Sequence, residues 1–377
     1  MKPLFFYGTL RHVPLLHVVM GDGSDRLTVS PARLPGYRVS AVAEGPFPMI
    51  VAEQGATAEG LLVQGLTLDD ISRLDFYEGS FAYDLIDVTL EGEQAARVYL
   101  PQPDLWTADG PWSLDDWARD WGALSVYAAE EVMGYYGNRS REDVARMFPM
   151  IRARAAARVR AEQSVHGRDC FGGRVEILSR KRSYAHFFAV DDVMLRHEKF
   201  DGSMSEPLDR AVFVAADAAL VLPYDPKRDR VLLVEQVRLG PIGRGDRTQW
   251  QLEPIAGRVD PGETPEEAAR REAREEADLD LDALEKIAEV YPSPGTSSEF
   301  YYVYLGLADL PDGVAGTSGL AAENEDIRSH LLEFDDLMAR VARHDVANAP
   351  LALAAYYLSH HRERLRSGRP GDTPRQD

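Results

Sequence analysis

The sequence has one cysteine, Cys170, among 377 residues, which excludes an intramolecular disulfide and favours a reducing compartment. No apolar run approaches the roughly 20 residues that a membrane span needs. The opening residues, Met1–Gly8, are too short and too soon interrupted for a signal peptide. Positive charge is also scarce: 42 Lys and Arg against 62 Asp and Glu leave a net charge of −20, which argues against non-specific nucleic-acid binding. We therefore expect a cytoplasmic protein with no membrane or nucleic-acid partner.

What the chain does contain is typical of a globular protein with two domains. Hydrophobic residues make up 45% of it and charged residues 28%. A chain of 377 residues is too long to fold around one ordinary hydrophobic core. Short strand patterns fill the N-terminal part, helical patterns follow from Ser113 to about Gln163, and a second β-rich part begins near Val175. We predict an α+β chain with a first domain over 1–137, a helical linker over 138–168, a second domain over 169–366 and a disordered tail over 367–377.

Individual elements are predicted where turn and capping residues bound an apolar pattern. Ser113 and Ser140 each precede an acid three residues later, Asp116 and Asp143, which is typical of a helix start. Helices are also expected at 265–277 and 349–366. Strands are expected at Leu4–Tyr7, Leu61–Leu66, Tyr83–Leu90, Arg97–Leu100, Asp217–Pro223, Arg230–Gln236 and Phe300–Leu305.

Four arginines end the linker pattern: Arg152, Arg154, Arg158 and Arg160. Such a row can bind nucleic acid, but the strongly negative net charge favours the simpler interpretation. We expect these side chains to form a solvated face of the linker helix.

One stretch, from Gly257 to Leu279, carries a complete set of helix-start signals. Thr264 can cap the helix and Pro265 suits its first position. Glu267, three residues after the cap, completes a capping box, so the start of the helix is well defined.

Three carboxylates follow on one face of this helix. Glu272, Glu275 and Glu276 fall at i, i+3 and i+4, which are adjoining positions. They repel one another and lie near the helix C-terminus, where the macrodipole disfavours negative charge. A bound hard cation such as Mg²⁺ would relieve both penalties, because it takes oxygen ligands.

A solvated acidic helix that pairs with its own arginines is the alternative, and Glu267 and Arg271 do fit an i, i+4 pair. That alternative does not explain the spacing. Five residues separate Gly257 from Glu263, and seven separate Glu263 from Arg271, before an Arg-Glu-x-x-Glu-Glu ending. The stretch resembles the Nudix box, a loop–helix–loop that binds divalent metal on the diphosphate of a nucleoside derivative.

Two positions depart from that box. Asp278 stands where glycine is usual, which predicts a tighter or strained helix end. Ala273 replaces the usual large aliphatic residue, as often happens in the ADP-ribose-cleaving branch. Neither departure removes a metal ligand.

Segments around the box resemble the bacterial ADP-ribose pyrophosphatases over about 170–365: 200–205 ahead of Arg210, 222–226, 233–238, 250–253, 293–299 and 322–326. The resemblance implies a Nudix α/β/α sandwich that forms a homodimer through its N-terminal strands. It also implies hydrolysis of a small nucleoside diphosphate, ADP-ribose, to AMP and ribose 5-phosphate. The cofactor would be Mg²⁺, with Mn²⁺ as a substitute.

The same resemblance assigns roles to individual residues. The metal ligands would be Glu272, Glu275, Glu276 and the carbonyl of Ala256, with Glu276 also counted as catalytic. The substrate would be held by Arg210 and Arg238 at its phosphates or ends, by Phe187 on adenine, and by Glu253 and Glu299 on the ribose side. Glu323 would be the general base for water, with Glu325 as its substitute.

Alternatives stay open for several of these assignments. Arg210 and Arg238 could be ordinary ion-pair arginines, Phe187 could belong to a core or a dimer interface, and Glu323 stands in an acidic run that could simply be solvated. The reaction could instead be cleavage of a related sugar nucleotide such as GDP-mannose. A module that binds ADP-ribose without cleaving it is a further alternative, against which the complete glutamate set argues.

The N-terminal part resembles the gamma-glutamylcyclotransferase-like fold, a small β-barrel, in Phe6–Leu10, Pro35–Tyr37 and Leu74–Gly79 followed by Tyr83. The resemblance implies that the loop of Tyr7, Gly8, Thr9 and Leu10 offers backbone N–H groups to a carboxylate or oxyanion. It implies that Glu78 is a base, which frees an α-amino group to attack its own γ-amide and close 5-oxoproline. The alternatives are a turn residue at Glu78 and a binding or structural module on the same fold.

Overall fold

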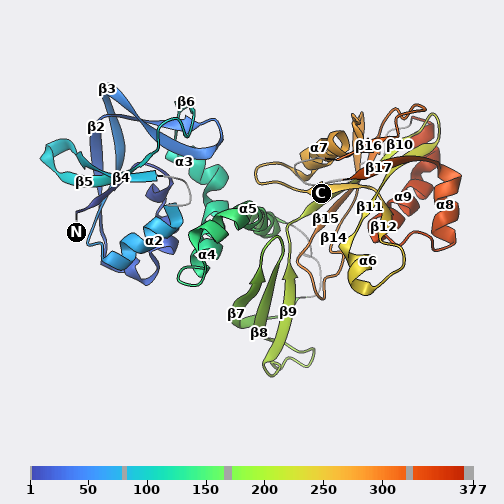
Figure 1. Ribbon diagram of the computed structural model, residues 1–377. Coiled ribbons are helices and arrows are strands. Elements are labelled where there is room, and N and C mark those ends of the chain that lie inside the picture. The colour runs from blue at the N-terminus through green and yellow to red at the C-terminus, as the bar shows by residue number, and fades with distance from the viewer. Residues whose placement is uncertain (1, 79–82, 165–171, 320–325, 369–377) are drawn as a thin grey trace. The chain divides into compact units, whose positions relative to one another are not determined.

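The computed structural model describes residues 2–78, 83–164, 172–319 and 326–368 (Figure 1). The chain divides into two compact units, Met1–Arg168 and Asp169–Asp377. Both mix helices with sheets, as the sequence predicts. In the part of the chain described, no helix is both long and apolar enough to cross a membrane.

The first unit is organised around a six-stranded sheet in the order β4-β5-β1-β3-β2-β6. The pair β1–β5 is parallel, and the other neighbours are antiparallel. Over the described residues this order is open at β4 and β6, so the closed barrel that the resemblance implies is not confirmed. The strands are β1 (Leu4–Phe6), β2 (Thr28–Val42), β3 (Gly45–Gln64), β4 (Tyr83–Thr89), β5 (Ala95–Pro101) and β6 (Ala108–Pro111).

Helices pack around this sheet, and two of them begin where capping serines predict. Ser113 Oγ accepts a hydrogen bond from the N–H of Asp116 at 3.2 Å, and Ser140 Oγ accepts one from the N–H of Asp143 at 3.1 Å. The helices are α1 (Val13–Met20), α2 (Leu68–Glu78), α3 (Leu114–Trp117), α4 (Ala123–Gly134) and α5 (Arg141–Gln163), with short helical turns η1 (Thr9–Arg11), η2 (Gly21–Arg26), η4 (Glu91–Glu93) and η5 (Ala118–Gly122).

Helix α5 lies within the first unit and packs along α4. The expectation of a solvated arginine face is wrong for Arg154, which is 5% exposed, with its Nε 3.2 Å from Glu131 Oε2. Arg158 is half-exposed and pairs with Glu130 on α4 at 2.8 Å. The spacing of the arginines does not predict the burial of Arg154, because which face of α5 is buried depends on how α5 packs against α4.

The second unit contains an eight-stranded sheet and a separate three-stranded sheet. In the larger sheet β10 and β15 are parallel, and the other pairs are antiparallel. Its strands are β10 (Ala218–Asp225), β11 (Arg230–Val237), β12 (Trp250–Glu253), β13 (Ile255–Arg258), β14 (Ala283–Val290), β15 (Tyr301–Leu307), β16 (Thr317–Ser318) and β17 (Ile327–Glu333). The smaller sheet holds β7 (Val175–Ala185), β8 (Ala189–His197) and β9 (Leu208–Val214).

Helices cover both faces of the larger sheet (Figure 1). Along β10, Ala219 and Val221 pack in one core cluster with α7, while Leu220 and Leu222 pack in the other with α8 and α9. This alternation of side chains places a buried strand between two helical layers. The helices are α6 (Leu239–Arg244), α7 (Pro265–Ala277), α8 (Phe334–Ala342) and α9 (Ala349–Arg366). Most of the tail predicted over 367–377 lies outside the described residues.

Candidate functional sites

Helix α7 of the second unit begins with the predicted capping box. Thr264 Oγ1 accepts a hydrogen bond from the N–H of Glu267 at 3.2 Å, and the Glu267 carboxylate accepts one from the N–H of Thr264 at 2.8 Å. At the other end Asp278 takes the left-handed conformation, with φ 50° and ψ 43°. Glycine adopts this conformation without steric cost, which gives a physical reason for its usual presence there.

Arg271 gathers the carboxylates of this helix and of the loop before it. Its guanidinium donates to Glu263 Oε1 at 2.7 Å, to Glu272 Oε1 at 2.6 Å and to Glu275 Oε2 at 3.0 Å. It also donates to the carbonyl oxygen of Arg258 at 2.9 Å. The hydrogen bond with Glu263 is the largest cause that raises the pKa of Arg271, and Glu272 adds to it.

The backbone of β13 lies directly against two of these carboxylates. Glu276 is buried, and its Oε2 accepts a hydrogen bond from the N–H of Ala256 at 3.3 Å. A Cβ atom on Gly257 would lie 1.8 Å from Glu272 Oε1, so this position must be glycine for Glu272 to keep its place. The fold therefore brings Ala256, Glu272 and Glu276 together where β13 meets α7.

The chemistry of this donor set fits a hard divalent cation. It consists of carboxylate and carbonyl oxygens alone, as Mg²⁺ prefers. Within the described ranges no three His, Cys, Asp or Glu side chains are arranged as a ready metal cage. Glu263, Glu272 and Glu275 are instead arranged around the guanidinium of Arg271.

A second group of predicted residues meets beside β12 and β15. Arg238 Nε donates to Glu253 Oε2 at 2.7 Å, and the other oxygen of this buried glutamate accepts a hydrogen bond from Asn348 Nδ2 at 2.9 Å. Tyr301 donates its hydroxyl to Glu299 Oε2 at 3.2 Å. Burial raises the pKa of Glu299, opposed by the Tyr301 hydrogen bond and by the charge of Arg238. Arg238, Glu253 and Glu299 thus form one cluster.

Of the remaining residues predicted for the site of this unit, the two that the structure describes do not belong to the Arg238 cluster. Phe187, half-exposed between β7 and β8, faces Arg258 of the box, with the guanidinium carbon 5.0 Å from the ring centroid. Arg210 lies exposed on β9 and donates to the carbonyl oxygen of Asp209 at 2.7 Å. Of the hydrogen bonds within the described residues, none joins Arg210 to the Arg238 cluster. Glu323 and Glu325 lie outside the described residues.

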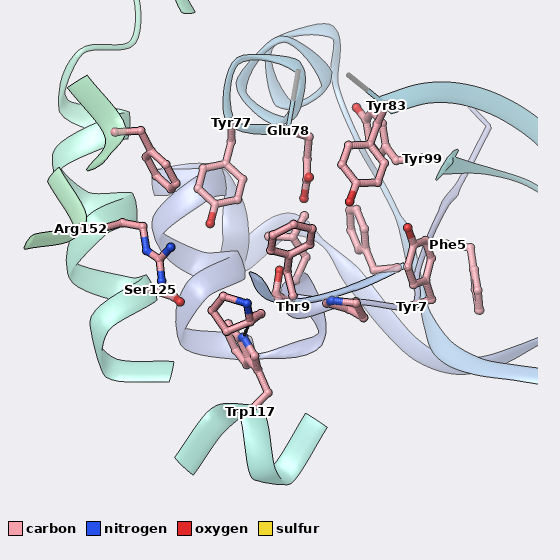
Figure 2. Close-up of a pocket in the computed structure, with 17 residues that line it drawn as sticks. Phe5, Tyr7, Thr9, Tyr77, Glu78, Tyr83, Tyr99, Trp117, Ser125 and Arg152 are labelled. Atoms are coloured by element: carbon pink, nitrogen blue, oxygen red, sulfur yellow. Dashed lines mark hydrogen bonds between the residues drawn. The ribbon is translucent and has the colours of Figure 1, made fainter. Parts of the chain in front are cut away.

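The first unit contains a pocket of about 150 Å³ around the predicted loop (Figure 2). Tyr7, Gly8, Thr9 and Leu10 line it together with Glu78, which ends helix α2. In Figure 2 the Glu78 carboxylate points into the space between Tyr77 and Tyr83. All the residues predicted for this unit are therefore found around one cavity.

The walls of this pocket control the protonation of Glu78. Burial among aromatic side chains raises the pKa of Glu78 to about 7, where a carboxyl group exchanges protons readily at neutral pH. Burial also raises the pKa of Tyr7 and Tyr83, and the charge of Glu78 adds to both shifts. These phenols therefore stay protonated around the carboxyl group, as hydrogen-bond donors.

Several residues of these sites were missed by the sequence analysis. Asn348 and Tyr301 support the Arg238 cluster through hydrogen bonds, and no spacing motif points to either. Asn348 could have been noticed as a helix cap, since its side chain also accepts from the N–H of Leu351 at 2.9 Å. Ser125 and Arg152 line the pocket of the first unit from α4 and α5, where the sequence shows only a helical pattern.

Comparison with known families matches both units. A family model described as NUDIX domain matches residues 214–353. A second model, described as Gamma-glutamyl cyclotransferase, AIG2-like, matches residues 4–119.

Three relatives illustrate the similarity of the second unit. The ADP-ribose pyrophosphatase of Escherichia coli (strain K12) is 37% identical over 193 residues, which are 51% of this chain and 91% of that protein. The ADP-ribose pyrophosphatase of Haemophilus influenzae is 38% identical over 161 residues, 42% of this chain and 74% of its own length. The GDP-mannose pyrophosphatase of Cronobacter sakazakii is 27% identical over 184 residues, 49% and 94% of the two chains. The chain belongs to the Nudix family, with the ADP-ribose pyrophosphatases among its relatives, and it carries a gamma-glutamyl cyclotransferase-like domain ahead of its Nudix domain.

Proposed function

We propose that the second unit hydrolyses the diphosphate of ADP-ribose to AMP and ribose 5-phosphate. The observation that carries this proposal is the gathering of Glu272 and Glu276 against the backbone of Ala256 and Gly257. The 37% identity to an ADP-ribose pyrophosphatase supports this substrate. The alternative, a GDP-mannose-type sugar nucleotide, has the support of a lower identity, 27%.

Ala256, Glu272, Glu275 and Glu276 would hold a divalent cation, Mg²⁺ or its substitute Mn²⁺. When bound, such a cation neutralises phosphate charge and stabilises the leaving oxygen. Arg271 contacts two of the same carboxylates and anchors them to the loop at Arg258 and Glu263.

The Arg238 cluster suits the phosphates and the ribose side of the substrate. Its guanidinium can bind a phosphate oxygen, and Glu253 and Glu299 can accept hydrogen bonds from ribose hydroxyls. Phe187 would stack on adenine, and Arg210 would bind the phosphates or the far end of the substrate. Glu323, with Glu325 as its substitute, stays our predicted general base for the attacking water.

AMP release from ADP-ribose tests this function, with Glu276→Gln as the variant. We expect Mg²⁺-dependent hydrolysis that this variant lowers at least about 100-fold, since one oxygen donor is lost without a change in size. Glu266→Gln, half-exposed on the same helix and paired with Lys286 at 3.6 Å, is the matched control and should stay near wild type. Equal rates for Glu276→Gln and wild type would contradict the proposal.

A second function is favoured by Glu78. We infer that the first unit cyclises a γ-glutamyl compound on the small barrel that its resemblance implies. Glu78 accepts a proton from the α-ammonium group, and the nitrogen lone pair attacks the γ-carbonyl carbon to form the ring C–N bond. The original amide C–N bond then breaks. Overall, two protons pass from the attacking to the leaving nitrogen, which gives 5-oxoproline and a free amine with no water consumed.

Homodimerisation and a cytoplasmic location stay predictions. Four apolar side chains on β7 and β8 are exposed, and this exposure supports a dimer through these strands. They are Val175, Ile177, Tyr184 and Met194. Light scattering on the full chain would test it, and a monomeric mass at micromolar concentration would contradict it.

A further inference from the structure

The pocket of the first unit has a wall that the cyclotransferase-like family model does not cover. That model ends at residue 119, but Ser125 on α4 and Phe148 and Arg152 on α5 also line the cavity. Helix α5, expected from the sequence to be a linker, is therefore part of the pocket of the first unit.

This additional wall supplies the cationic side chain of the pocket. Among the described residues that line the cavity, Glu78 is the one acid and Arg152 is the one base. Figure 2 shows the Arg152 guanidinium pointing into the pocket beside Ser125, on the side away from Tyr7 and Tyr83. The ring of Trp121 lies under this guanidinium, 5.6 Å from its carbon to the ring centroid, and helps to hold it in place.

The two charged groups face different parts of the cavity. Burial raises the pKa of Glu78, and in Figure 2 its carboxylate and the Arg152 guanidinium lie in different parts of the pocket. The Arg152 charge instead opposes the rise in the pKa of Tyr77, which lies between them in Figure 2. A substrate whose amino group contacts Glu78 would therefore extend its other end toward Arg152.

We propose that Arg152 is a specificity-determining residue that binds a carboxylate on the leaving-group side of the substrate. The pocket then selects a γ-glutamyl amino acid over a γ-glutamyl alkylamine, and the proposal rests on the cyclisation proposed above. A guanidinium binds a carboxylate with two charge-assisted hydrogen bonds, and the largely aromatic walls limit screening by water. Ser125, next to it, can donate a further hydrogen bond from its hydroxyl.

A matched substrate pair tests this inference on the full chain. In γ-glutamyl-isopropylamine a methyl group replaces the carboxylate of γ-glutamyl-alanine. We expect wild type to release 5-oxoproline from the alanine compound with at least about tenfold higher kcat/KM. Arg152→Gln should lower kcat/KM for that compound about 10- to 100-fold, mainly through KM, and leave the isopropylamine compound within about threefold.

Two further variants separate charge from folding. Arg152→Lys keeps the charge and should recover part of the loss on the alanine compound, while it also leaves the isopropylamine compound unaffected. Arg146→Gln, on the same helix but exposed and paired with Asp143, is the matched control and should behave as wild type. Equal losses on both substrates, or no preference in wild type, would overturn the role of Arg152.

A binding measurement keeps the inference testable if neither substrate is turned over. That outcome would reject the cyclisation, and calorimetry would then compare γ-glutamyl-alanine binding to wild type and Arg152→Gln. A Kd weakened at least tenfold by the substitution would support carboxylate binding by Arg152. An unchanged Kd, or no binding to wild type, would reject it.

Discussion

The two units of this chain set their glutamates in opposite surroundings. In the first unit Glu78 is the one carboxylate among the described residues that line its largely aromatic pocket, and burial raises its pKa to about 7. In the second unit three glutamates, Glu263, Glu272 and Glu275, contact the guanidinium of Arg271. The hydrogen bond with Glu263 and the charge of Glu272 raise the pKa of Arg271. A glutamate side chain can therefore exchange protons near neutral pH in the first unit, whereas in the second unit the glutamates lie beside a positive charge.

This difference shows how environment assigns chemistry to a carboxyl group. A single carboxyl group withdrawn from water can take and return a proton near neutral pH. Several carboxylates on one helix face instead need a positive partner, which Arg271 supplies here and a divalent cation would supply during catalysis. The comparison predicts that the two sites can be disabled separately.

Glu78→Gln should have the largest effect of a single substitution. It removes the proposed base without a change in size, so 5-oxoproline release should fall about 100- to 10,000-fold. AMP release from ADP-ribose, measured on the same preparation, should stay at the wild-type rate. Cyclisation that survives in Glu78→Gln would show that the raised pKa has no catalytic role.

Gly257→Ala makes the corresponding test in the second unit. The added Cβ would lie 1.8 Å from Glu272 Oε1, so this carboxylate must move. A displacement of about 1 Å at a reacting centre can cost about 100-fold, and we expect a loss of that order in kcat for AMP release. Gly240→Ala is the control, because a Cβ there meets nothing within 4 Å. Wild-type kcat in Gly257→Ala would mean that Glu272 is not a ligand.

The pH dependence should distinguish the two glutamate environments. Because the pKa of Glu78 is raised to about 7, its basic form gains population as the pH rises through 7. We expect 5-oxoproline release to increase about tenfold between pH 6 and pH 8. A glutamate at its ordinary pKa of 4.5 would be ionised throughout this range and would give a flat profile, which would contradict the burial argument.

Asp278→Gly should give the smallest effect, and on stability alone. Asp278 holds a left-handed conformation that costs an ordinary residue about 1–2 kcal/mol, while glycine adopts it freely. We expect the second unit to gain about 1 kcal/mol in free energy of unfolding, measured by urea titration, with AMP release unchanged. A loss of stability would mean that the Asp278 side chain contributes more than its backbone costs.

Local signals in the sequence predicted the parts that depend on neighbouring residues. The capping box at Thr264 and Glu267 and the helix starts at Ser113 and Ser140 need no knowledge of the fold. The motif around Glu78 also led to the pocket, because its residues come from short contiguous segments.

Features that depend on distant contacts were beyond the sequence. Asn348 supports Glu253 across 95 positions, and Arg152 turns into a pocket while Arg154 is buried against α4. Helical periodicity identifies a face but not its partner, so a solvated face and a pocket wall give the same pattern. For the same reason the order of strands in the first sheet was not predictable from the strand patterns.

The most direct test of the central claim is AMP and GMP release by the purified full chain, with Mg²⁺, from ADP-ribose and GDP-mannose in parallel. We predict rapid Mg²⁺-dependent release of AMP and slower release of GMP. Preference for GDP-mannose would keep the Nudix chemistry but contradict the substrate. Binding of ADP-ribose without turnover of either compound would contradict the claim that this Nudix unit is an enzyme.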